Sequence, residues 1–122
     1  MTYLIARSSA RVLLLVLPLL VVTLETDAVR TIDVTVSRFA FSPARIELRA
    51  GERTRLNIAS ADGTHGFQVK ELDVDVEIPG GGETMSIEIT PEQAGTFTVR
   101  CSEYCGRGHN RMTASLIVAP PR

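Results

Sequence analysis

The stretch Thr96 to Val118, TFTVRCSEYCGRGHNRMTASLIV, decides how the chain folds, because it joins two alternating segments through one loop. Phe97 and Val99 alternate with polar residues before the loop, and residues 113–118 alternate in the same way after it. Strict alternation is typical of strands that bury one face. The parity therefore places Cys101 on the buried side, at the end of the first strand.

The same period of two recurs upstream. Apolar residues alternate with polar ones around residues 32–36, 46–48, 56–58, 67–69, 72–78 and 85–89. Turn residues rich in glycine and proline separate these segments. Seven or eight short strands of this kind predict an all-β sandwich or small barrel. Asp73, Asp75 and Glu77 take outward positions, which predicts a solvated face and leaves an acidic docking surface as the alternative.

The chain has 122 residues, which suits one domain, and its net charge of −1 offers no basic surface for nucleic acid. Residues 1–28 are predicted to be an export segment. Arg7 and Arg11 precede an apolar run from Val12 to Leu24, which is shorter than the ~20 residues of a membrane-spanning helix. A secretory signal is predicted, with a short membrane anchor as the alternative. Either way, residues 29–122 are expected on the periplasmic or other extracytoplasmic face.

The loop concentrates metal donors. Cys101, Cys105, His109 and Met112 follow the spacing Cys-x3-Cys-x3-His-x2-Met. Thiolate and thioether sulfur, together with imidazole, suit copper better than a hard cation. A disulfide across three residues closes a very small loop and would stabilise little, so metal binding is the better use of the cysteine pair.

Two further ligands are expected. His65 is the only other histidine of the chain, and it lies in a turn region that a sandwich can bring to the same end. Glu103 lies midway between the cysteines, so its backbone carbonyl should face whatever they hold. The export segment and the strands offer no comparable donor cluster.

Several kinds of site compete for these donors. Zinc with two cysteines and two histidines leaves Met112 unexplained. A mononuclear copper site of two histidines, one cysteine and Met112 leaves Cys101 idle. Two coppers that share both thiolates use every donor, with one histidine each and with Met112 and the carbonyl of Glu103 as caps. A Cys/His hydrolase is disfavoured by the core-side position of Cys101 and by the methionine.

The loop at residues 101–112 resembles the binuclear CuA loop of cytochrome c oxidase subunit II. Residues 62–69 resemble the segment of its first histidine, and residues 41–52 are similar to the opening strands of its cupredoxin-like domain. The resemblance covers residues 31–119. It implies a cupredoxin-like Greek-key β-barrel in which six residues contact copper: His65, Cys101, Glu103 through its carbonyl, Cys105, His109 and Met112.

The resemblance also implies a task. Such a domain accepts electrons from a cytochrome c or a small cupredoxin and passes them to the haem-copper subunit I, without being catalytic alone. In many family members the loop glutamate also reaches a magnesium ion, a role that Glu103 matches. The single short hydrophobic segment is most similar to the b-type branch of oxidases. A free-standing periplasmic cupredoxin, acting as an electron shuttle or a copper-handling protein, is the alternative.

The electron-accepting surface is less well defined by the sequence. Many family members use aromatic residues there, often tryptophan, and this chain has no tryptophan. Phe41, Phe67 and Tyr104 are the aromatic residues available for such a surface.

Overall fold

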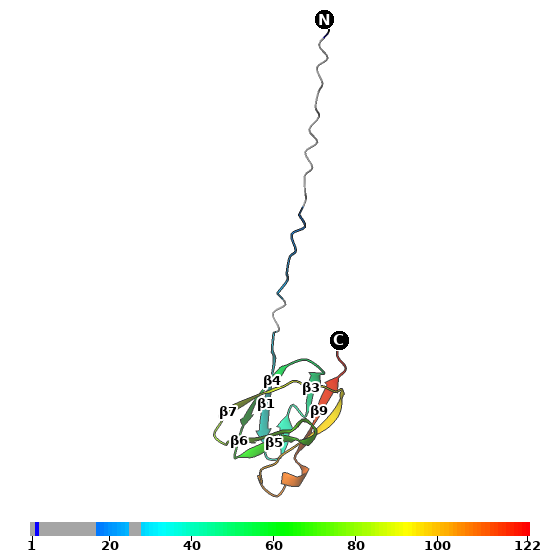
Figure 1. Cartoon of the computed structure of the whole chain (residues 1–122). Coiled ribbons are helices and arrows are strands. Elements are labelled where there is room, and N and C mark those ends of the chain that lie inside the picture. Colours follow the sequence, from blue (N-terminus) through cyan, green and yellow to red (C-terminus); the bar gives the residue numbers. More distant parts are fainter. Residues whose placement is uncertain (1, 3–16, 25–27) are drawn as a thin grey trace.

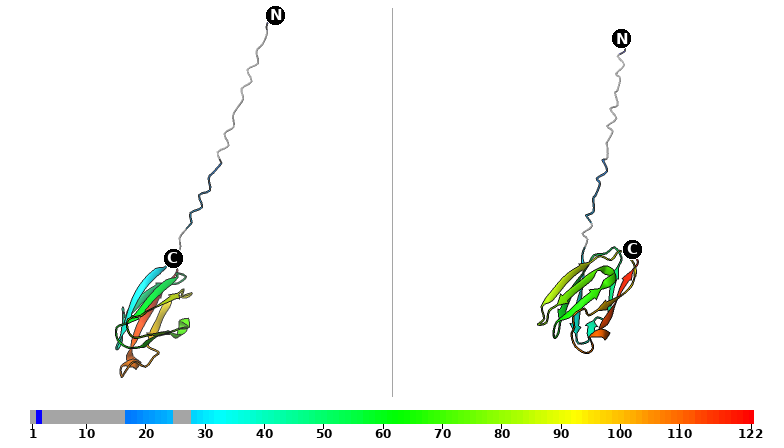
Figure 2. Two further views of the ribbon diagram at one scale, coloured as in Figure 1. Left: turned by 90° about the vertical axis from the view of Figure 1, so that its left-hand side faces the viewer. Right: turned by 60° about the horizontal axis from the view of Figure 1, so that its bottom comes forward.

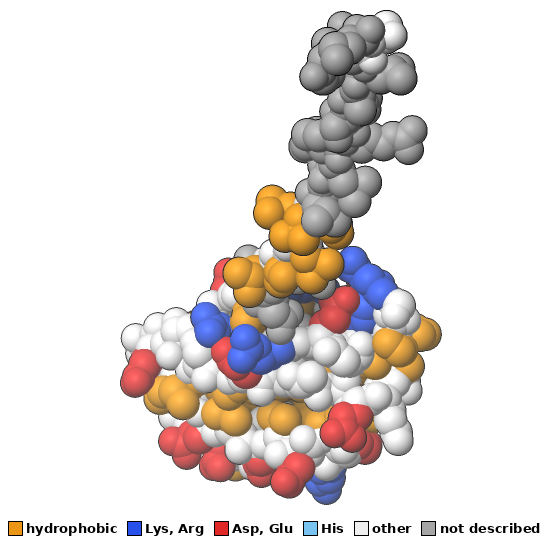
Figure 3. Space-filling model, turned by 45° about the horizontal axis from the view of Figure 1, so that its top comes forward, with side chains coloured by type: hydrophobic (Ala, Val, Ile, Leu, Met, Phe, Trp, Pro, Cys, Tyr) orange, Lys and Arg blue, Asp and Glu red, His pale blue; other side chains and the backbone are white. Residues whose placement is uncertain are grey.

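The structure is a computed structural model that describes residues 2, 17–24 and 28–122. Most of the predicted export segment, including Arg7 and Arg11, lies outside the described residues. The leucines and valines between residues 17 and 24 are exposed and are seen in orange in Figure 3. Over the described parts of the chain, no helix is both long enough and apolar enough to cross a bilayer.

Two β-sheets pack face to face in the described chain (Figures 1 and 2). One sheet has the order β2-β1-β4-β7, with β1 at Arg30–Ser37, β2 at Ala40–Ser42, β4 at Thr54–Ser60 and β7 at Thr84–Ile89. The other has the order β3-β9-β8-β5-β6, with β3 at Arg45–Arg49, β9 at Thr113–Ala119, β8 at Gly95–Arg100, β5 at His65–Val69 and β6 at Val74–Ile78. The pairs β1–β4 and β3–β9 are parallel, and the other pairs are antiparallel.

The inward positions of the alternating segments form one core. Val36, Ile58, Phe67 and Leu116 are completely buried between the sheets. Phe67 meets Phe41 edge to face, with 5.9 Å between the ring centroids. Burial of one face of each strand is the main source of stability for such a sandwich. The predicted all-β sandwich is therefore confirmed.

The structure differs from the alternating pattern in two places. Leu72 was expected to begin a strand, but it ends a short 3₁₀ turn, η1 at Lys70–Leu72, and Asp73 then adopts a left-handed conformation. The strand consequently begins at Val74. The second difference is β2, which is only three residues long and so too short to show a period of two. With β2 the described chain has nine strands instead of seven or eight.

The ligand-rich loop lies at one end of the sandwich, and the C-terminus lies at the other (Figure 1). β8 ends at Arg100 and β9 begins at Thr113, so both ends of the loop at residues 101–112 are anchored in one sheet. β5 begins at the same end, because Gln68 of β5 pairs with Arg100 of β8 and His65 lies three residues before Gln68. The topology therefore brings two distant parts of the sequence together.

Candidate metal centre

Two free thiols form the middle of the site. Cys101 and Cys105 are both buried, and their Sγ atoms are 3.6 Å apart. Cys101 directly follows the last residue of β8, and its inward direction continues the parity of Val99. The sulfur pair therefore lies at the rim of the hydrophobic core, as the alternation predicted.

His65 reaches this pair from β5. Its side chain is completely buried, and Nδ1 lies 4.0 Å from the Sγ of Cys101. Donor atoms of His65, Cys101 and Cys105 all lie within 4.8 Å of one another. The approach depends on Gly66, whose N–H donates to the sulfur of Cys101 over 3.4 Å. A Cβ on Gly66 would lie 2.6 Å from the backbone nitrogen of Ser102, so only glycine fits there.

The other predicted donors lie around the same sulfur atoms. His109 begins the short 3₁₀ turn η2 at His109–Arg111, and its Nδ1 is 3.8 Å from the Sγ of Cys105. The Sδ of Met112 is 3.7 Å from that sulfur, and its side chain is buried. The carbonyl oxygen of Glu103 is 3.1 Å from the Sγ of Cys101, while Glu103 as a residue is exposed.

The donor chemistry of this cluster fits copper. Two thiols, a thioether and two imidazole nitrogens are soft or intermediate donors, and no carboxylate faces the sulfur pair directly among the described contacts. The sulfur atoms are shielded from water by the core and by the loop itself. All six residues predicted from the sequence are thus brought together at one end of the sandwich.

Burial controls the protonation of Cys105. Desolvation, followed by the hydrogen bond shared with Cys101, raises the pKa of Cys105 to about 11. The positive charge of Arg38 acts to lower this pKa, and the negative charge of Asp62 acts to raise it. A metal must therefore displace a proton from Cys105, since the thiolate is the ligand.

Asp62 contacts His65, and the sequence pattern assigned no separate role to this aspartate. Its Oδ1 lies 2.5 Å from the Nε2 of His65, on the ring side opposite the sulfur pair. This hydrogen bond, together with one from the backbone N–H of Arg38, lowers the pKa of Asp62 to about 2. The one available signal was the position of an aspartate three residues before the histidine.

The turn between β1 and β2 also contacts the ligand loop. Arg38 Nε donates to the carbonyl oxygen of Cys105 over 3.0 Å. The ring of Phe39 lies so close to Gly108 that a Cβ there would collide with it. Nothing in the local sequence indicated either contact, because both depend on how the turn packs over a loop about 67 residues later.

The surface aromatics differ from those expected. Phe41 and Phe67 are buried in the core, which removes both as surface residues. Phe39 is 41% exposed, and Tyr104 is 78% exposed. The ring of Tyr104 lies 5.7 Å from that of His109, measured between centroids. The aromatic surface beside the site therefore consists of Phe39 and Tyr104.

Comparisons with known proteins bear on this site. Residues 10–118 match a family model described as a cupredoxin-like domain. Two cytochrome c oxidase subunit 2 sequences of Thermus thermophilus are each 32% identical to this chain over 88 residues, which is 72% of the chain. The matched part covers 64% and 52% of those relatives, so the chain spans less than two thirds of their length.

A solved structure has a similar fold. The periplasmic domain of subunit II of cytochrome oxidase (CoxB) of Bradyrhizobium japonicum superposes with a TM-score of 0.67. The superposition covers 75% of this chain and 84% of that domain, at 17% sequence identity.

Proposed function

We propose that this chain, which belongs to the cupredoxin-like domain family and is homologous to cytochrome c oxidase subunit 2, is a binuclear copper (CuA) electron-transfer domain. One observation carries the proposal. A buried pair of thiols, 3.6 Å apart, is surrounded by two imidazoles, a thioether and a carbonyl oxygen. A mononuclear site would leave one of these sulfur atoms without a role.

The proposed ligands have distinct tasks. The thiolates of Cys101 and Cys105 would be the central copper ligands, and the imidazoles of His65 and His109 would complete the strong donors. Met112 and the carbonyl of Glu103 would be the weaker ligands. Bound copper would supply a one-electron couple, while the chain keeps water out and holds the donors on a sandwich that rearranges little. The domain is not catalytic alone.

The homology to oxidase subunit 2 supports a proposal about the partners. We infer that a cytochrome c or a small cupredoxin donates electrons to this domain, and that a haem-copper subunit I accepts them. The exposed Glu103 side chain is free to reach a magnesium ion at that subunit interface. The domain would work on the periplasmic or extracytoplasmic face, released as a soluble form or held by the N-terminal segment.

A copper titration of residues 29–122 tests the proposal. We expect two coppers per chain and a purple mixed-valence signal in visible and EPR spectra. The Cys101→Ser variant should hold at most one copper, while Ser86→Ala on β7 of the other sheet should keep both. A Cys101→Ser protein with the full signal would refute the bridging role.

Two other outcomes identify the alternatives. One copper per wild-type chain, bound without a mixed-valence signal, would favour a free-standing cupredoxin that shuttles electrons or handles copper. A colourless protein with one zinc per chain would remove the copper proposal. The mature N-terminus separates the remaining choices, because a start near Val29 favours a soluble form and an intact Met1 favours a membrane-held subunit.

A further inference from the structure

The carboxylate of Asp62 connects two segments that meet at the sulfur pair. Its Oδ1 bonds to Nε2 of His65 and accepts the N–H of Gly63 over 2.8 Å. Its Oδ2 accepts the backbone N–H of Arg38, also over 2.8 Å. The Asp62 side chain is 29% exposed, whereas the His65 ring that it contacts is completely buried. One carboxylate thus fixes a buried ring and the β1–β2 turn together.

Arg38 continues this connection to the ligand loop. While its backbone N–H bonds to Asp62, its side-chain Nε donates to the carbonyl oxygen of Cys105. A chain of hydrogen bonds therefore runs from His65 through Asp62 and Arg38 to Cys105. It joins the histidine of β5 to the cysteine loop through Asp62 and the β1–β2 turn.

We propose, on the basis of the copper site described above, that Asp62 and Arg38 form a charged clamp that positions His65 and Cys105 and shifts the reduction potential in opposite directions. The positioning part follows from the hydrogen bond to Nε2, which keeps a proton on that nitrogen. Nδ1, the nitrogen that faces the sulfur pair, is then left with a free lone pair. A carboxylate in this position fixes both the tautomer and the orientation of a ligating histidine.

The electrostatic part follows from the signs of the two charges. Oxidation of the centre adds a positive charge, which the carboxylate of Asp62 stabilises and the guanidinium of Arg38 destabilises. Asp62 should therefore lower the reduction potential, and Arg38 should raise it. Because Arg38 is exposed, solvent and salt weaken its effect more than that of Asp62.

Charge-removing variants test the clamp. Asp62→Asn should raise the reduction potential measured by voltammetry and weaken copper binding about 10- to 100-fold. Arg38→Gln should lower the potential, and its effect should shrink at high salt. The double variant should return the potential toward that of the wild type while its copper affinity stays low. Opposite shifts of this kind are not produced by simple loss of structure.

Matched controls remove the same charges elsewhere. Asp73→Asn removes a carboxylate that follows the C-terminal end of β5, whereas His65 is at the N-terminal end of that strand. Arg53→Gln removes a guanidinium just before the start of β4, whereas Asp62 follows the end of β4. Both should leave the potential and the copper affinity unchanged. If Asp62→Asn and Arg38→Gln shift the potential in the same direction, or not at all, in protein that binds two coppers, the clamp is overturned.

A copper-free measurement separates this inference from the proposed function. In ¹⁵N NMR of the reduced apo-protein at mildly alkaline pH, His65 should be the Nε2–H tautomer. An Nδ1–H tautomer would overturn the clamp even if copper binds as proposed. Failure of the wild type to bind copper, with the Nε2–H tautomer present, would instead overturn the proposed function and leave the positioning part supported.

Discussion

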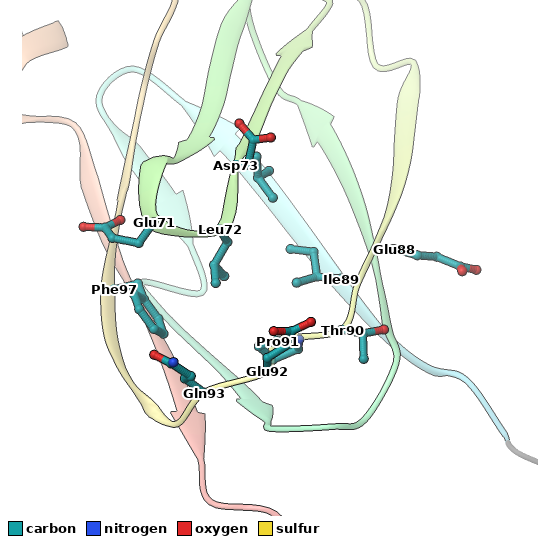
Figure 4. A pocket seen from close by; sticks show the side chains of 11 residues that line it. Glu71, Leu72, Asp73, Glu88, Ile89, Thr90, Pro91, Glu92, Gln93 and Phe97 are labelled. Atoms are coloured by element: carbon teal, nitrogen blue, oxygen red, sulfur yellow. The ribbon is translucent and has the colours of Figure 1, made fainter.

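Two hollows in this sandwich differ in size and in chemistry. The smaller one, about 180 Å³, lies at the metal end and is lined by Gln68, Arg100, Cys101, His109, Asn110 and Met112. The larger, about 710 Å³, is an acidic cleft that includes Glu71, Glu92 and the apolar side chains of Leu72, Ile89 and Phe97 (Figure 4). None of the residues that line the acidic cleft is a cysteine, histidine or methionine. The convergence of donors therefore identifies the site, whereas cavity size does not.

The difference arises from how the two regions are closed. β6 and β7 are the edge strands of different sheets and do not bond to each other, so the sheets separate along this side and leave the acidic cleft. At the metal end, the loop at residues 101–112 is held at both ends by β8 and β9. The β1–β2 turn and β5 also contact this loop, through the bonds from Arg38 to Cys105 and from Gly66 to Cys101, and hold it against the core.

The largest expected effect is at the contact between β5 and the ligand loop. Gly66→Ala should abolish copper loading, because the new Cβ would lie 2.6 Å from Ser102 N and 2.7 Å from Glu103 N, which are backbone atoms that cannot move independently of the loop. Copper stoichiometry measured by elemental analysis checks this.

Gly51→Ala is the matched control for that variant. Gly51 has a φ of +80° but no atom within 4 Å of a Cβ, so alanine there causes backbone strain of about 1–2 kcal/mol and no collision. This variant should unfold at a lower temperature and still bind copper in full. If Gly66→Ala loads copper normally, the close approach of β5 is not what forms the site.

The second effect is the pH dependence of loading. Burial raises the pKa of Cys105 to about 11, so this group is a thiol in the copper-free protein at neutral pH and must lose its proton to bind metal. For each proton released on binding, the apparent copper affinity should therefore fall about tenfold for every unit by which the pH is lowered below the pKa of Cys105. Competition titrations at stepwise pH measure this slope.

A carboxylate of the acidic cleft provides the comparison. Asp73→Asn removes an ionisable group that lines the cleft and should leave the slope unchanged, because that group releases no proton when copper binds at the other end. A copper affinity that is independent of pH would contradict binding through the thiols.

Much of this architecture could be predicted from local pattern. Alternation gave the strands, and the parity of Phe97 and Val99 placed Cys101 correctly at the rim of the core. The family match and the two sheets confirm the cupredoxin-like fold. The approach of His65 to the sulfur atoms also agrees with the prediction, since strand ends cluster at the ends of a sandwich. The roles of the six residues as copper ligands stay predictions.

What could not be predicted depends on contacts between distant segments or on single backbone conformations. The bond from Arg38 to Cys105 forms only after the β1–β2 turn has folded over the loop, so no local pattern encodes it. The left-handed conformation of Asp73 interrupts an alternation that otherwise continues from Leu72 to Ile78. Periodicity describes which face a residue takes, but it does not show where the chain leaves the sheet.

The smallest effects should separate stability from metal binding. Ile89→Ala removes a side chain that is only 6% exposed at the edge of the acidic cleft, and it should lower the free energy of unfolding by about 2–3 kcal/mol. Its copper spectrum should not change, because Ile89 pairs with Thr54 at the far end of β4.

Met112→Leu should change the copper spectrum but hardly affect stability. The substitution keeps the side-chain volume, so it should lower the free energy of unfolding by less than about 1.5 kcal/mol, while it removes the thioether sulfur from the site. Chemical denaturation and visible spectra of both variants provide the measurement. If Ile89→Ala disturbed the spectrum as much as Met112→Leu does, the two ends of the sandwich would be coupled and would not act as separate regions.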